Sequence, residues 1–302
     1  MSLPNKIPFN KPPLTFAKQL QLLKSRGMIV NDDNKALNYL GQLNYYRLGA
    51  YWLPFEQSHQ SHQFLQGTTF ERVVDLYVFD RELRLLVLDA IERVEVSVRT
   101  RWAYILAHTH GTHAHTQASI FKPTWSHSTQ LQKLEDEYQQ SQEKFVQHLR
   151  NKHSESVPPL WVQVELFSFG QLSKWLANLT SSTDRNAICR HYGFDEVYFV
   201  SFMHHLTTIR NICAHHGRLW NRDLTVTFKL PSRNPQRLVP ALNNQQTRKL
   251  YNTLATLAFL LDGICIGHHW RKRLIDLIDK HQIDVAAMGF PSTWRTLPFW
   301  AT

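Results

Sequence analysis

Arg210 and His215 are the two residues whose types and spacing best suit acid–base chemistry on a phosphodiester. An imidazole with an unperturbed pKa of about 6.5 can accept or donate a proton near neutral pH. A guanidinium ion binds phosphate oxygens through planar, bidentate hydrogen bonds and stabilises the negative charge that develops on them. Asn211 would share a helix face with His215, where its amide can orient the imidazole or a phosphate oxygen.

The spacing between arginine and histidine does not by itself select this pair. Similar spacings occur elsewhere in the chain, at Arg101/His108, Arg185/His191 and Arg210/His216. What distinguishes the pair is the amphipathic helix predicted to carry it, which begins at Asp195 and ends near His215. Its apolar positions form one stripe, namely Phe199, Phe202, Leu206, Ile209 and Cys213. Another face displays a polar row, namely His204, Thr208, Asn211 and His215.

One straight helix does not bring Arg210 and His215 together. Five residues at about 100° each place the two side chains about 140° apart around the helix axis. Two arrangements therefore stay open. Either the helix breaks at Gly217 and His215 swings back toward Arg210, or two copies of the chain meet and each contributes to one cleft.

The rest of the chain is predicted to be helical as well. Helical periodicity covers 15–26, a short segment that opens at Asp33, 129–150, 161–179, 245–265 and 271–280. A capping box of Thr68 and Glu71 is predicted to begin the longest helix, and Gly111 to end it. Residues 224–230 alternate at period two and predict a single extended arm. Neither a βαβ rhythm nor a repeat is present, so the sequence predicts an all-α protein.

Several segments beside the Arg210–Asn221 segment have recognisable patterns. Residues 44–52 read Asn-Tyr-Tyr-Arg-Leu-Gly-Ala-Tyr-Trp, and the other such segments are residues 11–16, 26–28, 79–84, 95–99, 288–294 and 297–300. Together these segments resemble the abortive-infection AbiD/AbiF-like family of the HEPN superfamily, and the Arg210–Asn221 segment contains the Arg-x4-His pattern of HEPN ribonucleases. The resemblance implies a HEPN-like helical bundle with additional N-terminal helices and at most a small hairpin. It also implies a homodimer built around the Arg-x4-His pair.

The resemblance divides the chain into an N-terminal helical and aromatic segment, residues 1–66, and a HEPN-like domain, residues 67–302. The domain would carry a variable insertion at about 108–155. The activity implied is a metal-independent endoribonuclease with no cofactor. Because RNA supplies its own 2′-OH nucleophile, a base, an acid and a cation suffice, and the products would end in 2′,3′-cyclic phosphate.

Five further residues are candidates for RNA binding or for support of the site. His216, Arg218 and Asn221 follow the pair so closely that we expect at least one to touch substrate or a dimer partner. Glu95 and Arg99 are four residues apart on the predicted long helix. They either support the site from a facing helix or form an ordinary intrahelical ion pair.

Composition agrees with a nucleic-acid partner. The net charge of +10 favours polyanions such as RNA, either as substrate or as a regulatory non-coding RNA. No apolar run reaches the roughly 18 residues that span a bilayer, and no signal peptide is evident, so we expect a cytoplasmic protein without a membrane partner. Three scattered cysteines, Cys189, Cys213 and Cys265, are interpreted as small core residues. The histidines at 108–115 are expected to be solvated rather than to bind a metal.

Three functions remain to be distinguished. The leading one is a phage-defence effector that cleaves RNA. The second is a non-catalytic RNA-binding or ribonucleoprotein component of a defence or toxin–antitoxin system, in which the same arginine and histidine row grips RNA without cutting it. The third is a protein-interaction module that senses a phage component.

Overall fold

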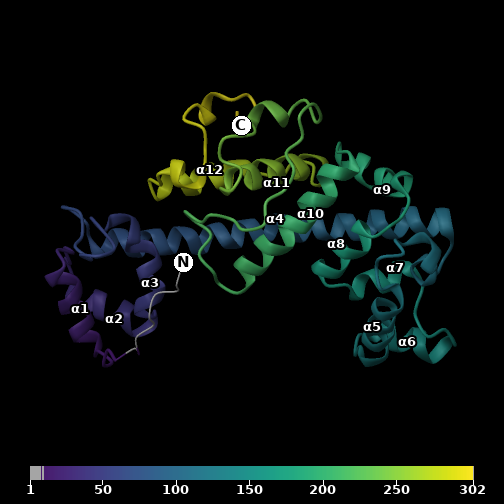
Figure 1. Ribbon diagram of the computed structural model, residues 1–302, viewed down its shortest axis with the longest axis horizontal. Helices are drawn as coiled ribbons and strands as arrows, with labels where there is room; N and C mark the ends of the chain where they lie inside the picture. The colour runs from purple at the N-terminus through teal and green to yellow at the C-terminus, as the bar shows by residue number, and fades with distance from the viewer. Residues whose placement is uncertain (1–7, 9, 302) are drawn as a thin grey trace, which may run out of the picture. The chain divides into compact units, whose positions relative to one another are not determined.

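The computed structural model describes residues 8 and 10–301 of the chain (Figure 1). Within these residues lie twelve α-helices and eight short 3₁₀ helices, without a strand, so the all-α prediction is confirmed. None of these helices is both long enough and apolar enough to cross a lipid bilayer. The α-helices are α1 (Phe16–Ser25), α2 (Asp33–Gln42), α3 (Tyr45–Trp52), α4 (Phe70–His110), α5 (His127–Gln140), α6 (Lys144–Lys152), α7 (Leu160–Gln163), α8 (Phe169–Ala177), α9 (Ser182–Cys189), α10 (Glu196–Ala214), α11 (Tyr251–Ile264) and α12 (Trp270–Lys280).

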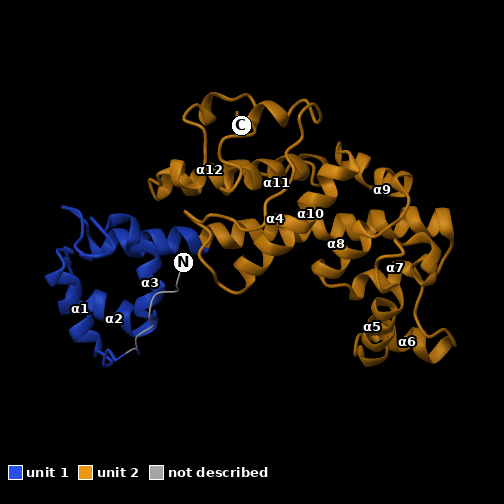
Figure 2. Ribbon diagram, in the orientation of Figure 1, with its two compact units in different colours: residues 1–81 blue, residues 82–302 orange. Residues whose placement is uncertain are grey.

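The chain divides into two compact units, residues 1–81 and residues 82–302 (Figure 2). The division falls inside α4, whereas the boundary expected from the sequence lies at residue 66. Unit 1 therefore contains α1, α2, α3 and the first turns of α4, and unit 2 contains the remaining helices.

The three short helices of unit 1 each begin at a side chain that accepts a backbone N–H. Thr15, Asp32 and Asn44 are these N-cap residues. Such side chains satisfy N–H groups that the first turn of a helix leaves without an intrahelical acceptor. Leu23 and Leu48 are fully buried beneath these helices. The predicted helices at 15–26 and from Asp33 are thus confirmed.

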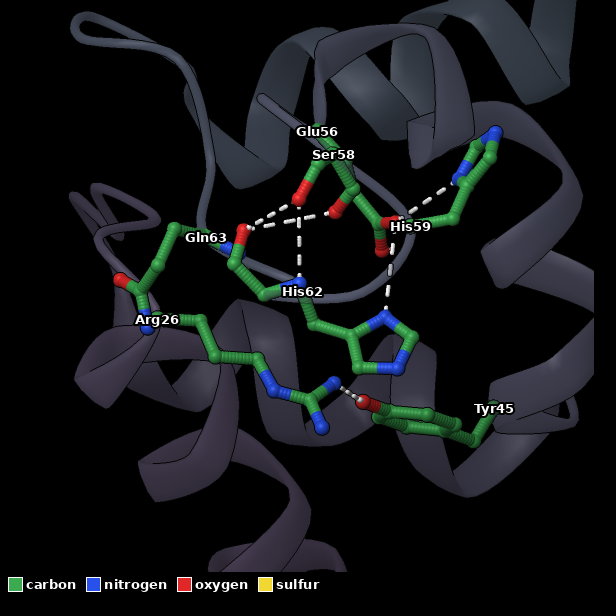
Figure 3. A network of polar contacts seen from close by, with 8 residues as sticks. Arg26, Tyr45, Glu56, Ser58, His59, His62 and Gln63 are labelled. Carbon is green, nitrogen blue, oxygen red and sulfur yellow. Dashed lines mark hydrogen bonds and ion pairs between the residues drawn. The ribbon is translucent and has the colours of Figure 1, made fainter.

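A polar network lies in the segment between α3 and α4 (Figure 3). The nearly buried carboxylate of Glu56 lies 3.3 Å from Nδ1 of His59 and 3.5 Å from Nδ1 of His62. His62 adopts a left-handed φ of 54°. On the other side of His62 in this view, Arg26 donates a hydrogen bond to the Tyr45 hydroxyl at 3.2 Å. The buried carboxylate thus orients two imidazoles and holds a segment that has little regular structure of its own.

The beginning of α4 differs by one residue from the prediction. The side chain of Thr69, and not that of Thr68, accepts a backbone N–H of the first turn, at 3.1 Å. Glu71 does not close a capping box, because its carboxylate accepts two hydrogen bonds from Asn31, each at 3.2 Å. The predicted end at Gly111 is confirmed, since α4 stops immediately before this residue.

In unit 2, α4 and α12 lie side by side. The indole Nε1 of Trp270 donates to the carbonyl oxygen of Leu86 at 2.8 Å, and Lys280 reaches Glu82 at 3.0 Å. Elsewhere in unit 2, α10 packs against α8 and α9. Hydrogen bonds and an ion pair therefore join α4 to α12, and packing joins α10 to α8 and α9.

Several predicted helices in unit 2 have different bounds. The helix expected at 129–150 is two helices, α5 and α6. The helix expected at 161–179 is also split, because Ser168 and Gln171 form a capping box that begins α8. The C-terminal apolar helix begins at Tyr251, later than predicted, and α9 was not predicted at all.

Residues 224–230 do not form the expected strand arm. Their backbone groups bond to side chains of α10 instead. The carbonyl oxygen of Val226 lies 2.7 Å from Nδ1 of His205, and the N–H of Lys229 donates to the Ser201 hydroxyl at 3.0 Å. An extended segment that finds its partners on a helix needs no second strand, so no hairpin forms.

The histidine-rich stretch at 108–115 is not simply solvated, which corrects the expectation. His110 lies 2.9 Å from the carboxylate of Asp184, and His115 is fully buried. Neither ring nitrogen of His115 has a hydrogen-bond partner among the described residues. Over residues 8 and 10–301, no three His, Cys, Asp or Glu side chains are placed to bind one metal ion.

Two buried histidines make the stability of unit 2 depend on pH. Burial lowers the pKa of His115 to about 3 and that of His205 to about 4. Both values lie below the unfolded value of about 6.5, so the folded state resists protonation. Stability is therefore fully present above about pH 6.5 and is lost as the pH falls toward the two folded-state values.

Each of these histidines is expected to lower the free energy of unfolding by about 1.4 kcal/mol per pH unit below about pH 6. Urea denaturation followed by circular dichroism at several pH values measures this slope. The His115→Leu variant should show a shallower slope, whereas His108→Leu, which removes an exposed histidine of the same stretch, should not. Equal slopes in the wild type and His115→Leu would contradict the assignment.

Candidate active site at the end of helix α10

Helix α10 carries the predicted pair and has the predicted faces. Asp195 occupies its N-cap position. The apolar stripe is buried in full: Phe199, Phe202, Leu206, Ile209 and Cys213. In the polar row, His204, Asn211 and His215 are exposed and Thr208 is half-buried. The burial pattern read from the sequence is therefore confirmed, and α10 presents its polar row to solvent.

The helix ends in a Schellman motif. The N–H of Gly217 donates to the carbonyl oxygen of Ile212 at 2.8 Å, and the N–H of His216 donates to that of Cys213 at 3.1 Å. His216 has the left-handed φ of 57° that this motif requires and that glycine usually supplies. A Cβ on Gly217 would approach the Ile212 side chain and carbonyl oxygen at 3.3 Å, so the chain is tightly packed here.

The break in the helix comes after His215 and does not turn this residue toward Arg210. The N–H of His215 still donates to the carbonyl oxygen of Asn211 at 2.9 Å, which keeps the residue in helical register. Nη1 of Arg210 instead lies 3.4 Å from Oδ1 of Asn211. All three side chains are exposed. Of the two arrangements left open by the sequence, the structure thus gives no support to the bent helix.

Basic side chains gather around the segment that follows α10. Nζ of Lys249 lies 3.5 Å from Oδ1 of Asn221 and 2.9 Å from the carboxylate of Asp223. The pKa of Asp223 is lowered, first by its hydrogen bond with Lys249 and further by the charges of Arg248 and Arg218. Arg218 and Asn221 were named from the sequence, but Arg248 and Lys249 were missed because they lie far along the chain and carry no spacing signal.

Residues 38–221 match the family model described as Abi-like protein, which is more than half of the chain. The chain belongs to the Abi-like family. The match includes the similar segments at 44–52, 79–84, 95–99 and 210–221, whereas the segments at both ends of the chain lie outside it. No match was found among curated proteins or among solved structures. Family membership points to abortive infection, a form of phage defence.

The segment at 79–84 lies against the end of α10 in this Abi-like chain. The resemblance includes this segment but assigns it no role. Arg84, from the 79–84 segment, is only 5% exposed, and its Nη1 lies 3.4 Å from the carbonyl oxygen of Gly217. A buried guanidinium on α4 therefore holds the residue that follows His216. We interpret Arg84 as a positioning residue, which the sequence pattern alone could not identify.

Glu95 and Arg99 form the ion pair that their spacing predicted. Arg99 also donates hydrogen bonds to the carbonyl oxygens of Phe167, at 2.6 Å, and Glu165, at 3.3 Å. The pair is thus more than an isolated surface contact, because it fixes the turn before α8, and α8 packs against α10. Its contacts are with this turn, and a role in supporting the active site stays a prediction.

Substitution at His216 should reveal how strongly its backbone is constrained. Both His216→Gly and His216→Ala remove the imidazole, so they differ only in tolerance of the left-handed conformation. We expect the glycine variant to be more stable than the alanine variant by about 1 kcal/mol. Urea denaturation of the two variants measures the difference. Equal stability would show that the cap relaxes and does not fix this part of the chain.

Proposed function

We propose that this Abi-like protein is a phage-defence effector that cleaves RNA with Arg210 and His215. The observation that carries the proposal is the exposure of both side chains near a helix end that a Schellman motif closes. A base and an acid of the imidazole type suit RNA, which brings its own nucleophile. The basic side chains that follow α10 add attraction for a phosphate backbone.

The proposed reaction needs no group outside the RNA and the protein. One imidazole accepts the 2′-OH proton while the 2′ oxygen forms a bond to phosphorus. The bond from phosphorus to the 5′ oxygen breaks, and this oxygen receives a proton from a second imidazole. Arg210 binds the phosphate oxygens and stabilises the charge that develops on them. The products are a 2′,3′-cyclic phosphate and a 5′-OH end.

Two imidazoles at one phosphate are available when two chains combine. In a single chain, His215 remains in helical register and is displaced around the axis from Arg210. A twofold axis near the end of α10 would place His215 of each chain beside Arg210 of its partner, and such an isologous contact is the commonest form of self-association. The proposed assembly is therefore a homodimer with a composite site.

Loss of either side chain should remove cleavage. Arg210→Ala and His215→Ala are each expected to lower the cleavage rate at least about 100-fold without loss of fold, because both side chains are exposed. His204→Ala is the matched control, since it removes an exposed histidine from the same row. The assay is cleavage of labelled single-stranded RNA with and without EDTA, with product ends identified by mass spectrometry.

Two results would contradict this function. Cleavage that stops in EDTA and returns with a divalent ion would rule out the metal-independent mechanism. RNA that binds tightly to the wild type and is never cut would favour the non-catalytic ribonucleoprotein role.

Mixing two inactive variants tests the composite site. When Arg210→Ala and His215→Ala chains are refolded together, mixed dimers hold one intact arginine from one chain and one intact histidine from the other. The remaining imidazole can serve as the base, and water replaces the second imidazole as the acid that protonates the 5′ oxygen. We expect partial recovery of cleavage in the mixture and none in either variant alone. Sedimentation of the wild type as a monomer under active conditions, or the absence of recovery in verified mixed dimers, would overturn the shared cleft.

A further inference from the structure

A cleft of about 550 Å³ runs along one face of α4 in unit 2. Its lining comes from α4, from the short 3₁₀ helix at Arg190–Tyr192 and from the end of α11, and it includes no residue of the Arg210–Asn221 segment. We call it the Arg101 cleft. The residues that matter below are Arg93, Val96, Arg101, Tyr104, His191 and Ile264.

Near Arg101 the cleft has two nitrogen-bearing groups and no carboxylate bonded to either, and Glu92, the carboxylate that lines the cleft, precedes Arg93 on α4. Arg101 makes no hydrogen bond or ion pair with any residue that the structure describes. It lies close enough to His191 to lower the pKa of that imidazole, although burial is the larger cause. A phosphate can accept hydrogen bonds from both groups.

Apolar and aromatic side chains line the cleft on either side of Arg101 along α4, and they are open to solvent. Val96 and Tyr104 are each more than half exposed, and Ile264 completes the wall. Exposed aromatic and aliphatic surface next to a phosphate-binding group is the arrangement on which nucleobases stack. The Tyr104 ring already lies near an imidazole, that of His108, with centroids 4.1 Å apart.

The length of the cleft argues for a strand rather than for an isolated anion. Arg93 and Arg101 lie two turns apart on α4, which at the helical rise corresponds to about 12 Å. Arg93 is held at its end of the cleft by Asp89, at 3.0 Å, and by the Cys265 sulfur, at 3.2 Å. A ligand that uses the whole cleft must therefore extend beyond one phosphate group.

We propose that the Arg101 cleft binds a segment of single-stranded RNA, with a phosphate between Arg101 and His191 and a base against the wall of Val96, Tyr104 and Ile264. This assignment rests on the proposed function for the identity of its ligand. It does not depend on cleavage, because none of the cleft residues belongs to the proposed catalytic set. The cleft would act as a second contact that holds the RNA strand while Arg210 and His215 act elsewhere on it.

The test measures RNA binding and cleavage separately. Arg101→Gln removes the unpaired charge, and Arg233→Gln is the matched control, because it removes one exposed arginine from a loop outside the cleft. Binding of a labelled single-stranded RNA is measured by fluorescence anisotropy in a His215→Ala background. We expect Arg101→Gln to weaken binding at least about tenfold, as for loss of a charge-assisted hydrogen bond, and Arg233→Gln to have little effect. In the active protein, Arg101→Gln should raise KM and leave kcat nearly unchanged.

The outcomes separate this proposal from the proposed function. If Arg101→Gln weakens RNA binding and the wild type never cuts RNA, the RNA-binding role of the cleft stands and the proposed nuclease activity is wrong. If the Arg101→Gln and Arg233→Gln proteins cleave RNA normally and bind it with equal affinity, the RNA-binding role of the cleft is wrong and the nuclease activity stands. If Arg101→Gln weakens the binding of adenosine monophosphate but leaves the affinity for RNA unchanged, RNA is not the ligand of the cleft.

Discussion

The hydrogen bond from the N–H of Gly217 to the carbonyl oxygen of Ile212 closes the last turn of α10. Because it spans the end of the helix, it fixes where α10 stops and where the chain leaves it. His215 is the last residue to keep a helical hydrogen bond, and His216 must take a left-handed conformation. The same turn directs the following segment toward the core, where Trp220 is buried. The point at which the chain leaves α10, directly after His215, therefore follows from this single cap.

The features that the sequence could predict are those set by local pattern. The buried stripe and the exposed row of α10 follow from helical periodicity. Asp195 occupies the predicted N-cap position, although its side chain makes no capping hydrogen bond. The end of α4 at Gly111 follows from the ability of glycine to adopt the left-handed conformation that ends a helix. The predicted start of α4 is wrong by one residue, because Thr68 and Thr69 are equally suitable N-cap residues by type and Thr69 accepts the hydrogen bond. The carboxylate of Glu71 binds Asn31, which is distant in sequence, and therefore does not close a capping box.

The features that could not be predicted are those set by partners far along the chain. Arg84 acquires its role only because α4 lies against the end of α10, and Lys249 only because a later loop returns to Asn221. His115 differs from exposed histidines by burial, which its neighbours in sequence do not reveal, and His205 owes its partners to Val226 and Thr253, which lie later in the chain. Residues 224–230 keep the alternation of a strand, but side chains of α10 supply their partners.

The position of the candidate site at a helix C-terminus poses an electrostatic problem. The free carbonyl groups there carry partial negative charge, so a phosphate is attracted to the opposite end of a helix. In α10 the Schellman motif covers two of these carbonyls with N–H groups, and Arg84 covers the carbonyl of Gly217. Arg218 and Lys249 then add positive charge outside the helix. In the proposed function, attraction for RNA would therefore come from side chains gathered by the fold, and the helix end itself mainly sets the position of His215.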